Sequence, residues 1–256
     1  MTRMKSWLIV ASLLGAGVAL PAATPGDKPL PSMEDILQRV VERGAKEMEN
    51  DRLFDAHYGF TFQRTTDTKN TKGELKKTEE RVLKHDPSTA AAAKKKSEPV
   101  VTEASLKADA EAKGRAFEKR DFVLNTDIIR RFTFNVVGRE TIEGRPAVVL
   151  EFVPAGRNLP VKTFKDKFIN KAAGRVWIDE ADAVVVKVDM RLTEEVSVVG
   201  GLVGNVKRCV YGFLRARTPE GWWFTQNVRW QMEGRQFFTH KIMECHEQKK
   251  DVKRVM

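Results

Sequence analysis

The pattern of apolar and polar positions predicts one helix ahead of a long run of strands. From Ser32 onward, apolar residues recur at steps of three and four: Met33, Ile36, Leu37, Val40, Val41 and Met48. This spacing is typical of one face of a helix. Ser32, followed three positions later by Asp35, is a weak variant of the capping box that begins helices. We expect an amphipathic helix from Ser32 to Met48 that serves as a lid. Its lid residues are Ile36, Leu37, Val40 and Val41.

From His57 the period changes to two, which is typical of half-buried strands. The alternating apolar residues are Tyr58, Phe60 and Phe62, then Phe132, Phe134 and Val136, then Val148, Leu150 and Phe152, and finally Val184, Val186, Val188, Met190 and Leu192. Glu74 to His85 is more polar and predicts an edge strand. Further strands are expected at 175–178, 208–217, 222–232 and 236–245, with turns at Glu143–Gly144, Pro219–Gly221 and Glu233–Gly234.

These elements predict an α+β fold that is mainly β. Most of the connections are short, so neighbouring strands are antiparallel. The expected architecture is a strongly curved antiparallel sheet, or unclosed β-barrel, of about nine strands covered by the N-terminal amphipathic helix.

The predicted inner face carries more bulky side chains than one helix covers. A helix of about 16 residues is roughly 24 Å long, whereas nine strands about 4.8 Å apart span roughly 40 Å. Two interpretations remain open: a well-packed aromatic core, or a cavity that holds one apolar ligand. The candidate lining residues are Tyr58, Phe60, Phe62, Phe132, Phe134, Leu150, Phe152, Val186, Val188, Phe224 and Trp230.

The flanking and inserted segments have their own composition. Residues 1–23 have Arg3 and Lys5 ahead of a short apolar stretch and then small residues, which is typical of a cleaved secretory signal peptide; an uncleaved N-terminal anchor is the alternative. Residues 24–31 are expected to form a linker, and residues 32–256 a single domain. An Ala/Lys-rich insertion at about 87–120 interrupts that domain, with an exposed helix expected at 103–117.

The net charge of the chain and its expected compartment limit the kinds of partner that it can bind. The chain has 45 Lys and Arg against 35 Asp and Glu, a formal charge of +10, which falls to +8 without Arg3 and Lys5. For a protein secreted into the periplasm, nucleic acid is not an expected partner. Anionic lipid head groups or an acidic protein surface are better candidates.

The sequence contains no motif for catalysis or metal binding. The four histidines have no spacing typical of zinc sites, and a nucleophile elbow, a dinucleotide fingerprint and a phosphate loop are all absent. We therefore expect no catalytic residues, no metal, no cofactor and no enzymatic activity. Cys209 and Cys245 are the two cysteines. The predicted strand order separates them by two strands, although curvature leaves a disulfide open.

The stretches FNVVGRETIEGRPAVVLEFVPA and GRVWIDEADAVVVKVDM, within residues 132–190, resemble the hairpins of the LolA/LolB superfamily of periplasmic lipoprotein carriers. The resemblance implies an unclosed barrel with a helical lid and an apolar cavity for acyl chains. It carries over no individual ligand-contact residue, and the insertion departs from the family's pattern.

We expect a monomeric periplasmic carrier or chaperone that binds a lipid or a lipoprotein acyl chain, with a membrane-associated protein as a further partner. The alternative is a non-enzymatic envelope sensor or protein-interaction module on the same fold, favoured by the basic insertion.

Overall fold

The computed structural model describes residues 29–88, 124–161, 164–198, 204–236 and 239–255. The predicted signal peptide, most of the predicted linker and the helix expected at 103–117 lie outside these ranges.

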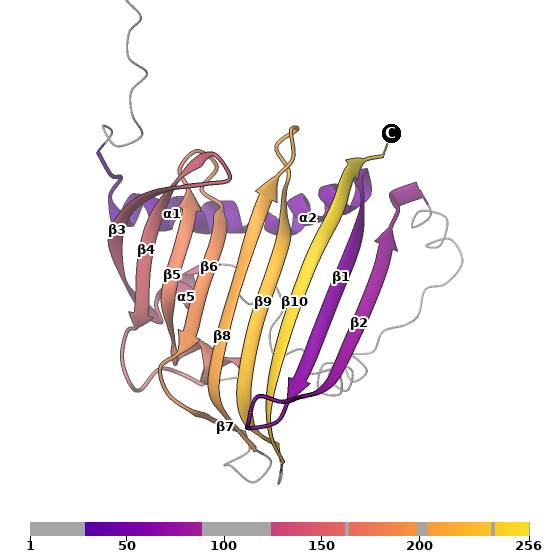
Figure 1. The fold of residues 1–256 in the computed structure, drawn as a ribbon. Helices are drawn as coiled ribbons and strands as arrows, with labels where there is room; N and C mark the ends of the chain where they lie inside the picture. Colours follow the sequence, from indigo (N-terminus) through magenta and orange to yellow (C-terminus); the bar gives the residue numbers. More distant parts are fainter. Residues whose placement is uncertain (1–28, 89–123, 162–163, 199–203, 237–238, 256) are drawn as a thin grey trace, which may run out of the picture.

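The described residues form one antiparallel sheet of ten strands (Figure 1). The spatial order is β2-β1-β10-β9-β8-β6-β5-β4-β3, with β7 paired to β8. The strands are β1 Tyr58–Lys69, β2 Leu75–His85, β3 Phe132–Ile142, β4 Arg145–Pro154, β5 Ala172–Asp179, β6 Val185–Leu192, β7 Val196–Val198, β8 Gly204–Arg217, β9 Trp223–Gln236 and β10 Thr239–Arg254. The predicted fold class, a curved and unclosed antiparallel sheet with an N-terminal helix, is confirmed. β2 is the edge strand that its polar sequence predicts.

The N-terminal helical region is longer than predicted and has two parts, α1 Met33–Gly44 and α2 Glu47–His57. Ser32 is the N-cap, and its hydroxyl accepts a hydrogen bond from the Asp35 backbone N–H, as expected. The helical phase changes at Ala45 and Lys46, between the two parts. Met48 therefore does not continue the apolar stripe of α1, and its side chain is 84% exposed.

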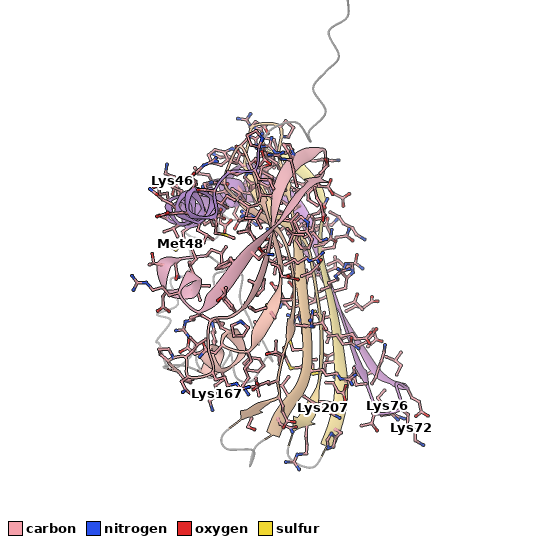
Figure 2. The ribbon with its side chains drawn as sticks, turned by 90° about the vertical axis from the view of Figure 1, so that its left-hand side faces the viewer. Lys46, Met48, Lys72, Lys76, Lys167 and Lys207 are labelled. Carbon is pink, nitrogen blue, oxygen red and sulfur yellow. The ribbon has the colours of Figure 1, made fainter. Side chains whose placement is uncertain are left out.

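Both helices lie on the same face of the sheet, which we call the helix face (Figure 2). α1 buries Ile36 and Val40 against β4, β5 and β6, where Leu150 is fully buried. α2 buries Phe54 against Tyr58 and Phe224. Two short helices, α5 Thr126–Ile129 and α6 Phe164–Ile169, precede β3 and β5. The main core therefore lies between the β3–β6 half of the sheet and α1.

A second, smaller core occupies the opposite face, which we call the outer face. Its buried members are Ala147, Val149, Trp177, Val184, Val186 and Trp223. Ala147 and Val149 alternate with Val148 and Leu150 along β4, so the two cores lie on opposite faces. The sheet is thus apolar on both faces near the turn that joins β5 to β6.

One predicted turn and one predicted strand face are also wrong. Glu233 and Gly234 do not form a turn, since β9 continues through them and Gly234 pairs with Lys241. Val186 does not share a face with Val188. A bulge between β5 and β6 pairs Ile178 with Val185 and Trp177 with Lys187, and this shift moves Val186 to the outer face.

In the ranges that the structure covers, every helix is too short or too polar to span a membrane.

Candidate functional site

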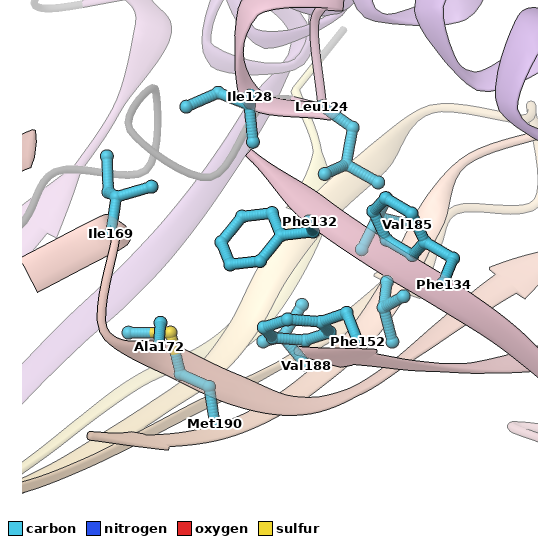
Figure 3. A pocket seen from close by; sticks show the side chains of 11 residues that line it. Leu124, Ile128, Phe132, Phe134, Phe152, Ile169, Ala172, Val185, Val188 and Met190 are labelled. Carbon is cyan, nitrogen blue, oxygen red and sulfur yellow. The ribbon is translucent and has the colours of Figure 1, made fainter. Parts of the chain in front are cut away.

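Two hollows lie on the helix face among the residues that the structure describes. The first, which we call the apolar cavity, has a volume of about 50 Å³ and lies between β3–β6 and the short helices (Figure 3). Its lining is Leu124, Ile128, Phe132, Phe134, Phe152, Ile169, Ala172, Val176, Val185, Val188 and Met190. Phe152 stands edge-on to Phe132, with ring centroids 5.0 Å apart. All eleven side chains are apolar, so none of them offers a hydrogen bond to a ligand.

The second hollow, which we call the aromatic groove, has a volume of about 310 Å³ and lies between α2 and strands β1, β8, β9 and β10. Its apolar lining consists of Phe54, Phe62, Tyr211, Phe213, Phe224, Val228 and Trp230, and its polar lining of Asp51, Asp55, Thr225, Gln226, Glu247, Gln248 and Lys249. This mixture suits a ligand with both an apolar and a polar part.

The charged groups of the groove gather beside α2. The Lys249 ammonium lies over the rings of Phe60 and Phe54, 4.2 Å and 4.9 Å from their centroids. The Asp55 carboxylate is 3.9 Å from the same ammonium. Glu247 pairs with Arg64 at 3.4 Å on the neighbouring strand. The Asp55–Lys249 contact places a polar rim at the α2 end of the groove, whereas the Glu247–Arg64 pair lies farther along the strands, level with Val228.

α2 is fixed to the sheet by polar side chains that the apolar pattern does not reveal. Arg215 on β8 donates to Glu47 at 2.8 Å, and both side chains are buried. The Asn50 side chain donates to the Trp223 carbonyl at 2.7 Å and accepts from the Trp223 N–H at 3.1 Å. Because a buried polar group is costly unless it is paired, these contacts set the position of α2 over the groove.

Tyr58 lies where α2 ends and β1 begins, beside the groove. Its hydroxyl donates to the Glu220 carboxylate. Burial, together with this bond, raises the pKa of Tyr58, and the same bond lowers the pKa of Glu220. The Tyr58 ring stacks on Phe54 at 5.1 Å, so Tyr58 supports the wall of the groove.

The predicted lining residues divide between several places. Phe132, Phe134, Phe152 and Val188 line the apolar cavity. Phe62, Phe224 and Trp230 line the aromatic groove. Leu150 is core beneath α1, Tyr58 and Phe60 pack with Phe54, and Val186 faces the outer side. Of the predicted lid residues, Ile36 and Val40 are buried in the core, Leu37 packs against it, and Val41 is half-buried.

Several lining residues were missed from the sequence. Tyr211 and Phe213 alternate within the predicted strand 208–217 and could have been found by that period. Leu124 precedes α5 and Ile128 lies within it, and this helix of four residues is too short to show a detectable period. Lys249 extends beyond the predicted end of the last strand at Cys245.

Cys209 and Cys245 are free thiols. Cys209 lies opposite Met232, and Cys245 lies opposite Trp230, so β9 runs between them. Burial raises the pKa of the Cys209 thiol to about 12 and also raises that of Cys245. The described residues contain no group of three or more His, Cys, Asp or Glu side chains arranged to hold a metal ion.

No protein-family model matches this sequence, and no curated protein matches it significantly. Among solved structures, an outer membrane lipoprotein-sorting protein domain from Vibrio parahaemolyticus shares 15% identity over 87% of this chain and 93% of that chain, with a TM-score of 0.33. A LolA superfamily protein from Nitrosomonas europaea shares 12% identity over 86% and 94% of the two chains, with a TM-score of 0.30. A chain of the MucA/MucB complex from Pseudomonas aeruginosa shares 9% identity over 87% and 99%, with a TM-score of 0.27.

These neighbours include the superfamily that the sequence resembles. Identities of 9–15% and TM-scores of 0.27–0.33 carry no argument about function, which must come from the hollows themselves.

Proposed function

We propose that this protein binds the acyl chain of a lipid or lipoprotein, non-covalently, in the aromatic groove. The observation that carries the proposal is the groove itself. Seven aromatic or aliphatic side chains surround a volume of about 310 Å³ beside a charged rim. Pockets for small molecules begin at roughly 300 Å³, so this hollow is large enough for an apolar ligand without rearrangement of the strands.

The physics of the groove favours an alkyl chain. Each methylene that leaves water for an apolar surface gains about 0.8 kcal/mol. Ten methylenes therefore supply roughly 8 kcal/mol before the cost of ordering the chain. The apolar cavity, at about 50 Å³, is too small to hold such a chain alone, since one water molecule already takes about 30 Å³ of the liquid.

We further propose that the protein acts as a carrier or chaperone in the periplasm. The N-terminal segment, with Arg3 and Lys5 ahead of an apolar stretch, supports export. The surplus of basic residues favours an encounter with anionic lipid head groups. A carrier has no need of a catalytic group, because it only has to bind and release.

Native mass spectrometry tests lipid binding directly. Protein purified without detergent should carry lipid, or should take up an added monoacyl phospholipid. Trp230→Ala removes a groove side chain and should weaken uptake at least about tenfold, since an aromatic side chain buries a large area. Gln231→Ala is the matched control, because Gln231 is the next residue on β9 and is exposed on the outer face. A wild-type protein that stays free of lipid at all concentrations would overturn the proposal, as would equal effects of the two substitutions.

The edge strand β2 favours a second candidate, a protein-interaction module. Ten of its eleven residues are exposed, including Leu75, Val82 and Leu83 at 57%, 57% and 44%. An exposed edge strand presents unpaired backbone groups to another chain. A photo-crosslinking residue at Val82 should then join β2 to one defined protein in intact cells, and the same residue at Val210 on the outer face should not. A chain without residues 89–120 should keep lipid uptake if the groove is the functional site.

A further inference from the structure

We infer that the apolar cavity and the aromatic groove are the two ends of one binding site, which takes a single long acyl chain with its methyl end in the cavity. This inference rests on the proposed function and deepens it, because it specifies how much chain the protein accepts and in which direction the chain lies.

The two hollows share a wall. The cavity is lined on β6 by Val188 and Met190, and the groove is lined on β8 by Phe213 and Tyr211. In the β6–β8 ladder, Val188 lies opposite Phe213, and Met190 lies opposite Tyr211. Directly opposed residues of an antiparallel pair point to the same face, with Cβ atoms about 5 Å apart. The two hollows therefore adjoin each other across these two cross-strand pairs.

One member of the wall is suited to move. Methionine is unbranched, has three rotatable bonds and adapts to irregular spaces. Met190 is half-buried, so rotation of its thioether does not require a change of the strand backbone. Val188 and Tyr211, by contrast, are each 6% exposed, and Tyr211 stands edge-on to Phe213 at 6.3 Å. We assign the connection between the hollows to a rotation of Met190, with Val188 and Tyr211 as fixed sides.

The distribution of polar groups sets the direction of the chain. The cavity lining is wholly apolar, so a polar head group placed there would lose its hydrogen bonds to water without replacement. The groove has Asp51, Glu247 and Lys249 along its lining, and these groups tolerate a hydrated head. An amphiphile with one acyl chain therefore lies across the strands, with its head beside α2 and its methyl end beside Phe152.

A chain-length series tests the connection. Monoacyl phosphatidylglycerols of 8 to 18 carbons keep one head group and vary only the tail. If the site is continuous, the affinity of the wild-type protein rises by up to about fourfold per added methylene, and the rise continues beyond the length that fills the groove. Met190→Trp enlarges the wall. It should leave short chains within about twofold of wild type and abolish the further gain for long chains, a loss of at least about tenfold.

Val210→Trp is the matched control, because Val210 adjoins Tyr211 on β8, faces outward and is 50% exposed. It should leave the whole series unchanged. Should Met190→Trp fail to fold, Met190→Ala gives the opposite test, since a smaller wall should improve the binding of long chains. A photoreactive group at the methyl end should label residues of the cavity, such as Phe152 or Ile128.

The failures of the two proposals are distinguishable. If no chain of any length binds, the proposed function is wrong. If chains bind, but the affinity stops rising in the wild-type protein as early as in Met190→Trp, or the terminal label reaches only groove residues, the groove binds lipid and the shared site is wrong.

Discussion

Glu47 on α2 accepts a hydrogen bond of 2.8 Å from Arg215 on β8, and both side chains are buried. Removal of one partner leaves the other charge buried without compensation, which typically costs about 3–5 kcal/mol. We therefore expect Glu47→Ala to lower the free energy of unfolding by about that amount, as measured by urea denaturation.

The same helix supplies the control for this prediction. Glu49 pairs with Arg52 at 2.6 Å, but the two side chains are 55% and 65% exposed. Exposed pairs contribute little to stability because water screens the two charges, so Glu49→Ala should have a small effect. Equal losses for the two substitutions would contradict the structural role of the Glu47–Arg215 pair.

The two thiols should be unreactive in the folded protein. Burial raises the pKa of Cys209 to about 12 from an ordinary 9.0, and it raises that of Cys245 as well. At pH 8 both groups are protonated and shielded, so iodoacetamide should not modify them within minutes. In urea without reductant, both should be alkylated, with two additions seen by mass spectrometry. A disulfide in the purified protein would leave both unmodified and would contradict the structure.

The same shift gives a dependence of stability on pH. The unfolded chain releases the Cys209 proton near pH 9, whereas the folded chain retains it until about pH 12. Between these values the folded state binds more protons, so the free energy of unfolding falls as the pH rises. Cys209→Ala should flatten this part of the profile. An unchanged slope in that variant would show that other groups are responsible.

Gly174 on β5 has a steric role. A Cβ atom at this position would lie 2.1 Å from the Asp189 carbonyl oxygen and 2.7 Å from the Met190 Cα on β6. Both contacts are with backbone, which cannot move aside without distortion of the ladder. We expect Gly174→Ala to cost at least about 2 kcal/mol in urea unfolding. Gly156→Ala is the control, since no heavy atom other than those of its chain neighbours lies within 4 Å of its Cβ position, and it should change stability by less than about 0.5 kcal/mol.

Alanine substitutions of Val186 and Val188 should both lower the free energy of unfolding, but only one of them should change lipid affinity. Both are buried, at 1% and 6% exposure, but they lie on opposite faces of the sheet. Each Val→Ala change removes two methyl groups and should cost about 1–3 kcal/mol in unfolding. Only Val188→Ala enlarges the apolar cavity, and it should alter the affinity for long acyl chains in calorimetric titrations. A change of affinity in Val186→Ala alone would place the ligand on the outer face and would contradict the proposed site.

Local signals in the sequence predict much of this fold. Ser32 begins the helix, the alternating pattern begins with β1 at Tyr58, and the turn at Glu143–Gly144 joins β3 to β4, as expected. At that turn, both Glu143 and Gly144 have positive φ angles, 49° and 76°, which is the conformation that two-residue hairpins require. Such features depend on neighbouring residues alone, and so they can be read from the chain.

The features that the sequence does not predict depend on contacts between distant residues. Val184 to Leu192 alternates without a break, so nothing in it marks the bulge that turns Val186 outward. The second helix, α2, lacks an apolar stripe because it buries Glu47 and Asn50 against partners on β8 and β9. Its place over the groove follows from those polar contacts, which no hydrophobic period records.

The pairing of β1 with β10 sets Tyr58 opposite Arg254, nearly two hundred positions apart along the chain. During synthesis, β1 leaves the ribosome long before β10. Until β10 has been synthesised, β1 has no partner strand on the side away from β2, and the sheet is incomplete between β1 and β9. Contacts between residues so far apart in sequence lower the folding rate. This topology therefore predicts that the protein folds slowly and completes its sheet late.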